Sequence, residues 1–156
     1  MSREFITKEV TKIFKDESLE YPLNMAMSAA WILGNYKGIN LKILDVSKTS
    51  SLADYFVLGS ATNITAAKAM ADEIAVQMRE LGHETISREG FTDTDWILID
   101  FGDVIVHIFQ ETTRSVYDLD NLWSGAKSIE IPQSYYFSSD AEDQSNSDQS
   151  DDRGFF

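Results

Sequence analysis

The chain has 156 residues and a formal net charge of −13, and its length suffices for one domain with a hydrophobic core. It contains no cysteine, which excludes disulfide bonds, thiolate zinc sites and cysteine nucleophiles. The negative charge argues against broad binding to a nucleic-acid backbone, so we expect little direct contact with nucleic acid and a basic protein as partner.

The first twenty residues are expected to be a partly helical extension. Ile6, Val10, Ile13 and Phe14 recur at helical spacing. The opening sequence MSREFITKEV lacks the apolar core of a secretory signal, and no run approaches the roughly 20 apolar residues of a membrane span. We therefore expect a cytoplasmic protein without a membrane partner.

The next part of the chain is predicted to form two helices around two strands. A helix follows Pro22 and ends near Gly34 or Gly38, and the strands read NLKILDVS and DYFVLGSA. A longer helix runs from Thr62 or Asn63, both good caps, to Gly82. Its expected buried stripe is Ile64, Ala67, Ala71, Ile74, Ala75, Met78 and Leu81, with Lys68, Asp72, Glu73 and Glu80 facing out.

Three further strands and a short helix complete the predicted domain. ETISRE is a weak third strand, WILIDFGDVIVHIF is a hairpin, and ETTRSVYDLDNLWSG is a short helix with a turn. This order predicts an α+β (mixed α/β) fold, in which a five-stranded mixed sheet is covered by helices mainly on one face.

The hairpin has a two-residue Gly-Asp turn, which pairs Phe101 with Val104 and fixes the other pairs by counting outward. One face is wholly apolar and should pack under the helices: Ile97, Ile99, Phe101, Val104, Val106 and Ile108. The other face holds Trp96 opposite Phe109, Leu98 opposite His107, and Asp100 opposite Ile105. This second face is neither a solvated surface nor a hydrocarbon core.

Two interpretations of the second face remain open. Aromatic and aliphatic groups beside one acid are typical of a protein-binding patch, with Trp96 and Phe109 as anchors and Asp100 supplying charge. Alternatively, the segment RSVYDLDNLW folds over this face and buries it inside the protein.

The sequence argues against catalysis. A lone His107 is more often a hydrogen-bonded structural histidine than a base, and no G-x-S-x-G elbow, P-loop, dinucleotide fingerprint or zinc spacing occurs. A Gly-Ser turn at residues 59–60 could cradle phosphates, but the carboxylate pair that nucleotidyl transfer needs is missing. We therefore expect no catalytic or metal site and no cofactor, and nucleotidyl transfer is the least favoured alternative.

The end of the chain is rich in Ser, Asp, Gln and Asn, and residues 138–156 hold six acids against one arginine. Such a composition cannot bury enough surface to offset its ordering entropy. The expected organisation is thus an extension over residues 1–20, a domain over 21–127, and an acidic disordered tail over 128–156.

Several blocks together resemble the ribosomal silencing factor (RsfS) or Iojap-like family: ILDVSKTSSLADYFVLGSATN, then EG at residues 89–90, WILIDFGDVIVHIF and RSVYDLDNLW. The resemblance implies a fold related to the nucleotidyltransferases without their catalytic carboxylates. It also implies binding to the large ribosomal subunit through ribosomal protein fourteen, which blocks joining of the small subunit and represses translation. Relatives in organelles imply an alternative role in large-subunit assembly.

The positions that match the family's blocks are Asp54, Tyr55, Trp96, Asp100, Gly102, Asp103, His107, Phe109, Arg114, Tyr117, Leu119, Leu122 and Trp123. Asn40 and Asp120 depart from the family pattern, where an aspartate and a glutamate are usual. The partner-binding residues expected from the hairpin and this resemblance are Trp96, Leu98, Asp100, Ile105, His107, Phe109, Arg114 and Tyr117. An uncovered apolar patch of this kind also predicts that the free protein can form a homodimer.

Overall fold

The computed structural model describes residues 2–90 and 95–137. The expectation for residues 138–156 lies outside this part of the chain. The helices are α1 (Arg3–Phe14), α2 (Leu23–Asn35), α3 (Ile64–Glu80), α4 (Arg114–Tyr117) and α5 (Leu119–Leu122), followed by a 3-10 turn, η1 (Gln133–Tyr135). The strands are β1 (Ile39–Asp45), β2 (Tyr55–Ala61), β3 (Ser87–Glu89), β4 (Trp96–Asp100), β5 (Val104–Gln110) and β6 (Lys127–Ile129).

The strands form one mixed sheet in the order β3-β4-β5-β2-β1-β6. β2 and β5 run parallel, whereas the other neighbouring pairs are antiparallel. The predicted α+β class is confirmed, but the predicted strand count is one too low. The missing strand, β6, has only three residues and pairs with the edge of β1, so it leaves no alternating pattern in the sequence.

The hairpin register is confirmed. Trp96 faces Phe109, Leu98 faces His107 and Asp100 faces Ile105. The turn closes through a hydrogen bond that the Phe101 amide donates to the Val104 carbonyl, at 2.9 Å.

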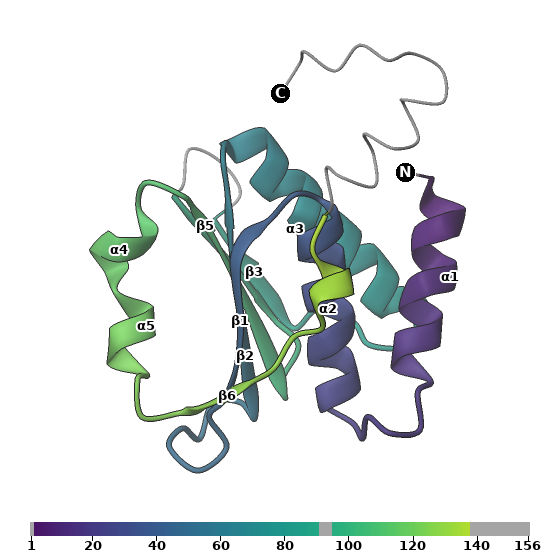
Figure 1. Ribbon diagram of the computed structural model, residues 1–156, viewed down its shortest axis with the longest axis horizontal. Helices are drawn as coiled ribbons and strands as arrows, with labels where there is room; N and C mark the ends of the chain where they lie inside the picture. The colour runs from purple at the N-terminus through teal and green to yellow at the C-terminus, as the bar shows by residue number, and fades with distance from the viewer. Residues whose placement is uncertain (1, 91–94, 138–156) are drawn as a thin grey trace.

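The sheet lies between two unequal layers (Figure 1). Helices α1, α2 and α3 lie on one side, where they enclose the main core with the six apolar hairpin residues predicted for that face. The small α4 and α5 lie on the opposite side, as a separate cover over the second face.

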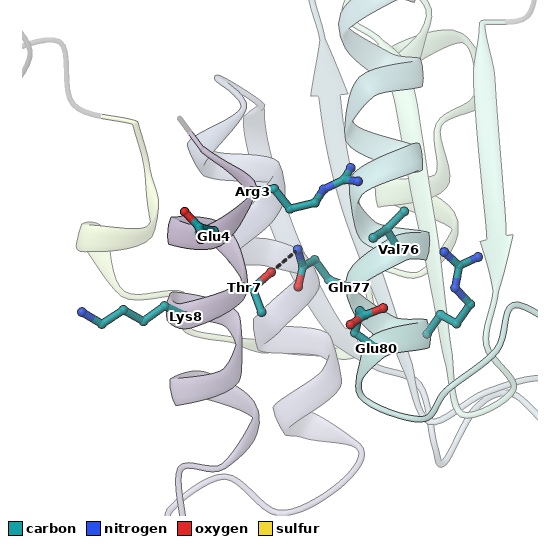
Figure 2. A pocket seen from close by; sticks show the side chains of 8 residues that line it. Arg3, Glu4, Thr7, Lys8, Val76, Gln77 and Glu80 are labelled. Atoms are coloured by element: carbon teal, nitrogen blue, oxygen red, sulfur yellow. Dashed lines mark hydrogen bonds between the residues drawn. The ribbon is translucent and has the colours of Figure 1, made fainter.

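The N-terminal helix α1 belongs to the main core. Ile6 and Val10 are fully buried, and Figure 2 shows Thr7 accepting a hydrogen bond from the Gln77 side-chain amide of α3, at 3.0 Å. Arg3 reaches Glu73 across the same helix pair, at 2.8 Å. These contacts fix α1 along one flank of a hollow of about 560 Å³ between the two helices.

The prediction that Glu73 faces solvent is wrong, because α1 covers its side chain. Burial alone would raise the pKa of Glu73, but hydrogen bonds from Arg3 and Gln77 outweigh it and hold that pKa below its usual value. Tyr36 donates a third hydrogen bond to this carboxylate, at 3.2 Å. The buried charge therefore helps to dock α1 on α3.

The expected start of the tail at residue 128 is also wrong. Residues 127–129 form β6, and Asn35 of α2 donates a side-chain hydrogen bond to the Tyr135 carbonyl at 3.1 Å. Ile129, Ile131 and Tyr135 pack against the main core. These apolar side chains give the segment enough buried surface to order.

Candidate protein-binding surface

The second face of the sheet is defined by strand register. Its side chains come from β3 (Ser87, Glu89), β4 (Trp96, Leu98, Asp100), β5 (Ile105, His107, Phe109), β2 (Phe56, Leu58, Ser60) and β1 (Lys42, Leu44). Side chains alternate between faces along a strand, so the apolar groups of this set meet in one cluster.

The α4–α5 cover buries the β5, β2 and β1 part of the second face. Leu119 of α5 is buried in the cluster. Trp123, just after α5, sets its ring edge-on to Phe56, with ring centroids 5.2 Å apart and planes at 84°. The alternative of internal burial is therefore correct for this part of the face.

The eight expected binding residues accordingly separate into groups. Trp96, Leu98 and Asp100 on β4 are half-buried and keep part of their side chains accessible to solvent. Ile105, His107, Phe109 and Arg114 are buried. The Tyr117 side chain lies outside the described part of the structure. We define the β4 strip as Trp96, Leu98 and Asp100.

Phe109 is not an accessible anchor, because its exposed fraction is 0%. Its ring stacks on Trp96 with centroids 5.1 Å apart and an interplanar angle of 25°. Phe109 thus supports Trp96 from below.

His107 holds Trp96 from a second direction. The Trp96 indole donates its Nε1 proton to His107 Nδ1 at 3.1 Å, which places the imidazole proton on Nε2. His107 is only 4% exposed, and burial lowers its pKa to about 4. A neutral, buried imidazole that accepts from an indole is a structural group, in agreement with the interpretation from sequence.

The low pKa of His107 predicts a pH-dependent stability. Between an unfolded pKa of about 6.5 and the folded value of about 4, acidification protonates the unfolded chain but not the folded one. At about 1.36 kcal/mol per pH unit, the free energy of unfolding falls by roughly 3 kcal/mol on account of His107 as the pH falls through that window. Urea titrations from pH 7 to pH 4 measure it, and His107→Gln should remove that part of the slope. An unchanged slope in the variant would contradict a neutral His107.

Asp100 has a structural role in addition to its exposure. Its Oδ1 accepts a hydrogen bond from the Gly102 amide at 2.7 Å, where Gly102 has φ +94°. Glycine adopts this left-handed conformation without strain. One carboxylate oxygen therefore fixes the turn.

An ionic cluster, not predicted from the sequence, fastens the α4–α5 cover to the sheet. Arg114 makes a two-point contact with Asp120, at 3.0 and 2.8 Å, and donates to Ser60 Oγ at 3.1 Å and to the Asn40 carbonyl. Lys42 contacts the same Asp120 carboxylate at 3.1 Å. The hydrogen bond from Arg114, helped by Lys42, holds the pKa of Asp120 well below its usual range. In the sequence, Arg114 and Asp120 lie six residues apart, and strand alternation places Lys42 on the second face. These two observations were the signals from which the cluster could have been predicted.

Gly59 and Ser60 do not form a phosphate-binding turn. Both lie inside β2, and Ser60 is fully buried under Arg114. A Cβ on Gly59 would approach the Leu33 side chain of α2 to 3.0 Å, so the glycine permits close helix packing.

The second face is therefore a rigid sheet face in which His107 and Phe109 hold the Trp96 ring in place. The chain belongs to the ribosomal silencing factor family, because the family model described as "Ribosomal silencing factor during starvation" matches residues 19–154. This family consists of regulators of the ribosome rather than enzymes. In the described ranges, no helix is long and apolar enough to cross a membrane.

Individual relatives agree with this assignment. The chain is 36% identical to the ribosomal silencing factor RsfS of Haemophilus influenzae over 92 residues, covering 59% of this chain and 90% of that one. It is 40% identical to RsfS of Bacillus subtilis over 83 residues, 53% of this chain and 70% of the relative. Protein Iojap of Zea mays is 32% identical over 113 residues, 70% of this chain and 48% of the relative.

A solved structure supports the same fold. A crystal structure of a protein from Bacillus halodurans superposes with a TM-score of 0.59 at 29% sequence identity, covering 70% of this chain and 96% of that one.

Proposed function

We propose that the protein binds the large ribosomal subunit through ribosomal protein fourteen and, by its bulk, keeps the small subunit from joining. Membership of the ribosomal silencing factor family supports this role. The observation in the molecule that carries the proposal is the β4 strip, where an aromatic ring, an aliphatic side chain and an acid remain accessible beside a buried cluster.

The strip has the chemistry of a surface for a basic protein. By register, Glu89 of β3 lies beside Leu98, and Ser87 lies beside Asp100. The two acids Glu89 and Asp100 therefore border the apolar Leu98. Negative charge steers encounter with a basic protein and is repelled by surrounding RNA, which favours one docking pose.

Trp96 is pre-ordered for binding. Its ring is stacked on Phe109 and its Nε1 is hydrogen-bonded to His107. A side chain that is already fixed loses little conformational entropy when a partner covers it. Trp96 is therefore the anchor that we assign to the interface. Repression then needs no chemical step, because the bound protein excludes the small subunit.

Co-sedimentation with purified large subunits tests the proposal. Trp96→Ala is expected to weaken binding by about 2 kcal/mol, roughly 30-fold, as is usual for an aromatic anchor. Phe5→Ala, an exposed aromatic on the α1 side of the molecule, is the matched control and should bind normally. Circular dichroism and urea unfolding establish that both variants are folded. Equal binding by the wild type and the folded Trp96 variant would remove Trp96 from the interface.

A role in large-subunit assembly is the second candidate. It is favoured by one relative from Mus musculus named "Mitochondrial assembly of ribosomal large subunit protein 1", which is 29% identical over 85 residues, 53% of this chain and 37% of that one. Depletion of the protein separates the two roles, because an assembly factor leaves incomplete large subunits and a pure repressor does not. Self-association of the free protein through the β4 strip remains a prediction that analytical ultracentrifugation can check.

A further inference from the structure

The α4–α5 cover exposes two branched apolar side chains. Val116 is 74% exposed and Leu122 is 71% exposed, the highest values among the large apolar side chains of the described residues. Single exposed apolar residues are ordinary on protein surfaces. Here two of them belong to a segment of nine residues that lies against the second face of the sheet.

The exposure does not come from a loosely attached segment. Leu119 is inserted into the second-face cluster. Arg114 pairs with Asp120 inside the segment and ties the segment to Ser60 of β2 and to the Asn40 carbonyl of β1. The two helices meet at Asp118, whose φ of +53° sets the angle between them. The backbone that carries Val116 and Leu122 is therefore held in place by contacts with the sheet.

The accessible charges of the cover are negative. Residues 111–126 contain Glu111, Asp118, Asp120 and a single cation, Arg114. Arg114 is buried against Asp120, which leaves Glu111 and Asp118 exposed without a cation of the segment beside them. Both acids line a hollow of about 590 Å³ that also reaches Lys42 of β1. A segment that exposes apolar side chains and whose own exposed charges are acidic complements a protein surface that combines apolar and cationic groups, and it disfavours nucleic acid.

We propose that the α4–α5 cover forms a second contact with the same basic protein partner, in which Val116 and Leu122 pack on apolar groups while Glu111 and Asp118 face Lys or Arg side chains. This inference rests on the proposed function and extends it from the β4 strip to a separate element. The ionic cluster under the cover orders this contact before binding, which reduces the entropy lost on docking.

The test is co-sedimentation of the full chain with purified large subunits. The double variant Val116→Ser/Leu122→Ser is expected to bind about tenfold or more weakly, whereas Phe5→Ser on the α1 side should bind as the wild type does. Both altered side chains are largely solvent-exposed, so the unfolding transition should stay close to that of the wild type. If the double variant is unstable, Val116→Thr, which preserves the branched shape, combined with Leu122→Gln provides the same comparison.

The outcomes are distinguishable. If the wild type does not co-sediment, the proposed function fails and this inference fails with it. If the wild type binds and Trp96→Ala weakens binding, but the folded double variant binds normally, only the second contact is overturned. A double variant that changes the oligomeric state of the free protein without changing subunit binding would assign Val116 and Leu122 to a contact between copies of this chain, and would also overturn the inference.

Discussion

Phe109→Ala is expected to lower the free energy of unfolding by about 3–5 kcal/mol, because it removes a fully buried ring and leaves a cavity. The Phe109 ring lies in the second-face cluster and stacks against both Trp96 and His107. Urea denaturation at neutral pH measures the loss. Leu122→Ala, which trims an exposed side chain, is the control and should change stability by less than about 0.5 kcal/mol.

The same experiment separates two roles for Phe109. A supporting ring predicts a large loss of stability, with weaker large-subunit binding only as a consequence of a displaced Trp96. A direct anchor, as the sequence suggested, predicts weak binding with stability close to that of the wild type. The second result would contradict the burial of this ring.

Arg114→Met is expected to lower the free energy of unfolding by about 2–3 kcal/mol, since it takes the buried guanidinium away from the partly buried Asp120 carboxylate and from the buried Ser60 hydroxyl. The Asp120 carboxylate would retain only the partly exposed Lys42. The matched control is Lys12→Met, which breaks the solvent-exposed pair with Glu9 and should cost less than about 0.5 kcal/mol. Equal effects of the two substitutions would show that the ionic cluster does not fasten the cover.

The Arg114 contact also predicts an acid-sensitive step. Arg114 holds the pKa of Asp120 below its ordinary value, so the stabilisation is complete above the unfolded pKa of about 3.9 and is lost as the pH falls toward the lower, folded pKa. In Arg114→Met this part of the acid dependence should largely disappear. Urea unfolding of both proteins between pH 5 and pH 2 provides the comparison.

Sequence reasoning was most successful in the hairpin, for a physical reason. A two-residue turn and the strict two-residue period of a strand leave one register, and a slip by one residue would have turned Asp100 and His107 into the main core. The division of the hairpin into an apolar face and a mixed face therefore followed from counting alone.

The cover over the second face could not be placed in the same way. Helices of four residues are too short to show a helical period, and Asp118 in a left-handed conformation breaks the pattern between them. The contact of Arg114 with Ser60 and the Asn40 carbonyl joins positions more than fifty residues apart. Such tertiary contacts decided which of the expected binding residues remain accessible.

Glu73 illustrates a related limit. Its position on the polar side of α3 predicted exposure. The helical periodicity of α3 carries no information about α1, which packs against that side. The buried carboxylate is accommodated because Arg3, Gln77 and Tyr36 all donate to it. An acid on a helix between apolar positions is thus compatible with burial whenever a neighbouring element supplies the donors.

If the bound protein keeps ribosomal subunits apart, as proposed, a subunit-joining assay will show it. Purified large subunits are incubated with the wild type or with Trp96→Ala before small subunits are added, and joined ribosomes are measured by sucrose-gradient sedimentation. We expect the wild type to reduce the fraction of joined ribosomes in proportion to its occupancy of the large subunit, whereas the variant at the same concentration does not. Full joining by large subunits that carry the wild-type protein would contradict it.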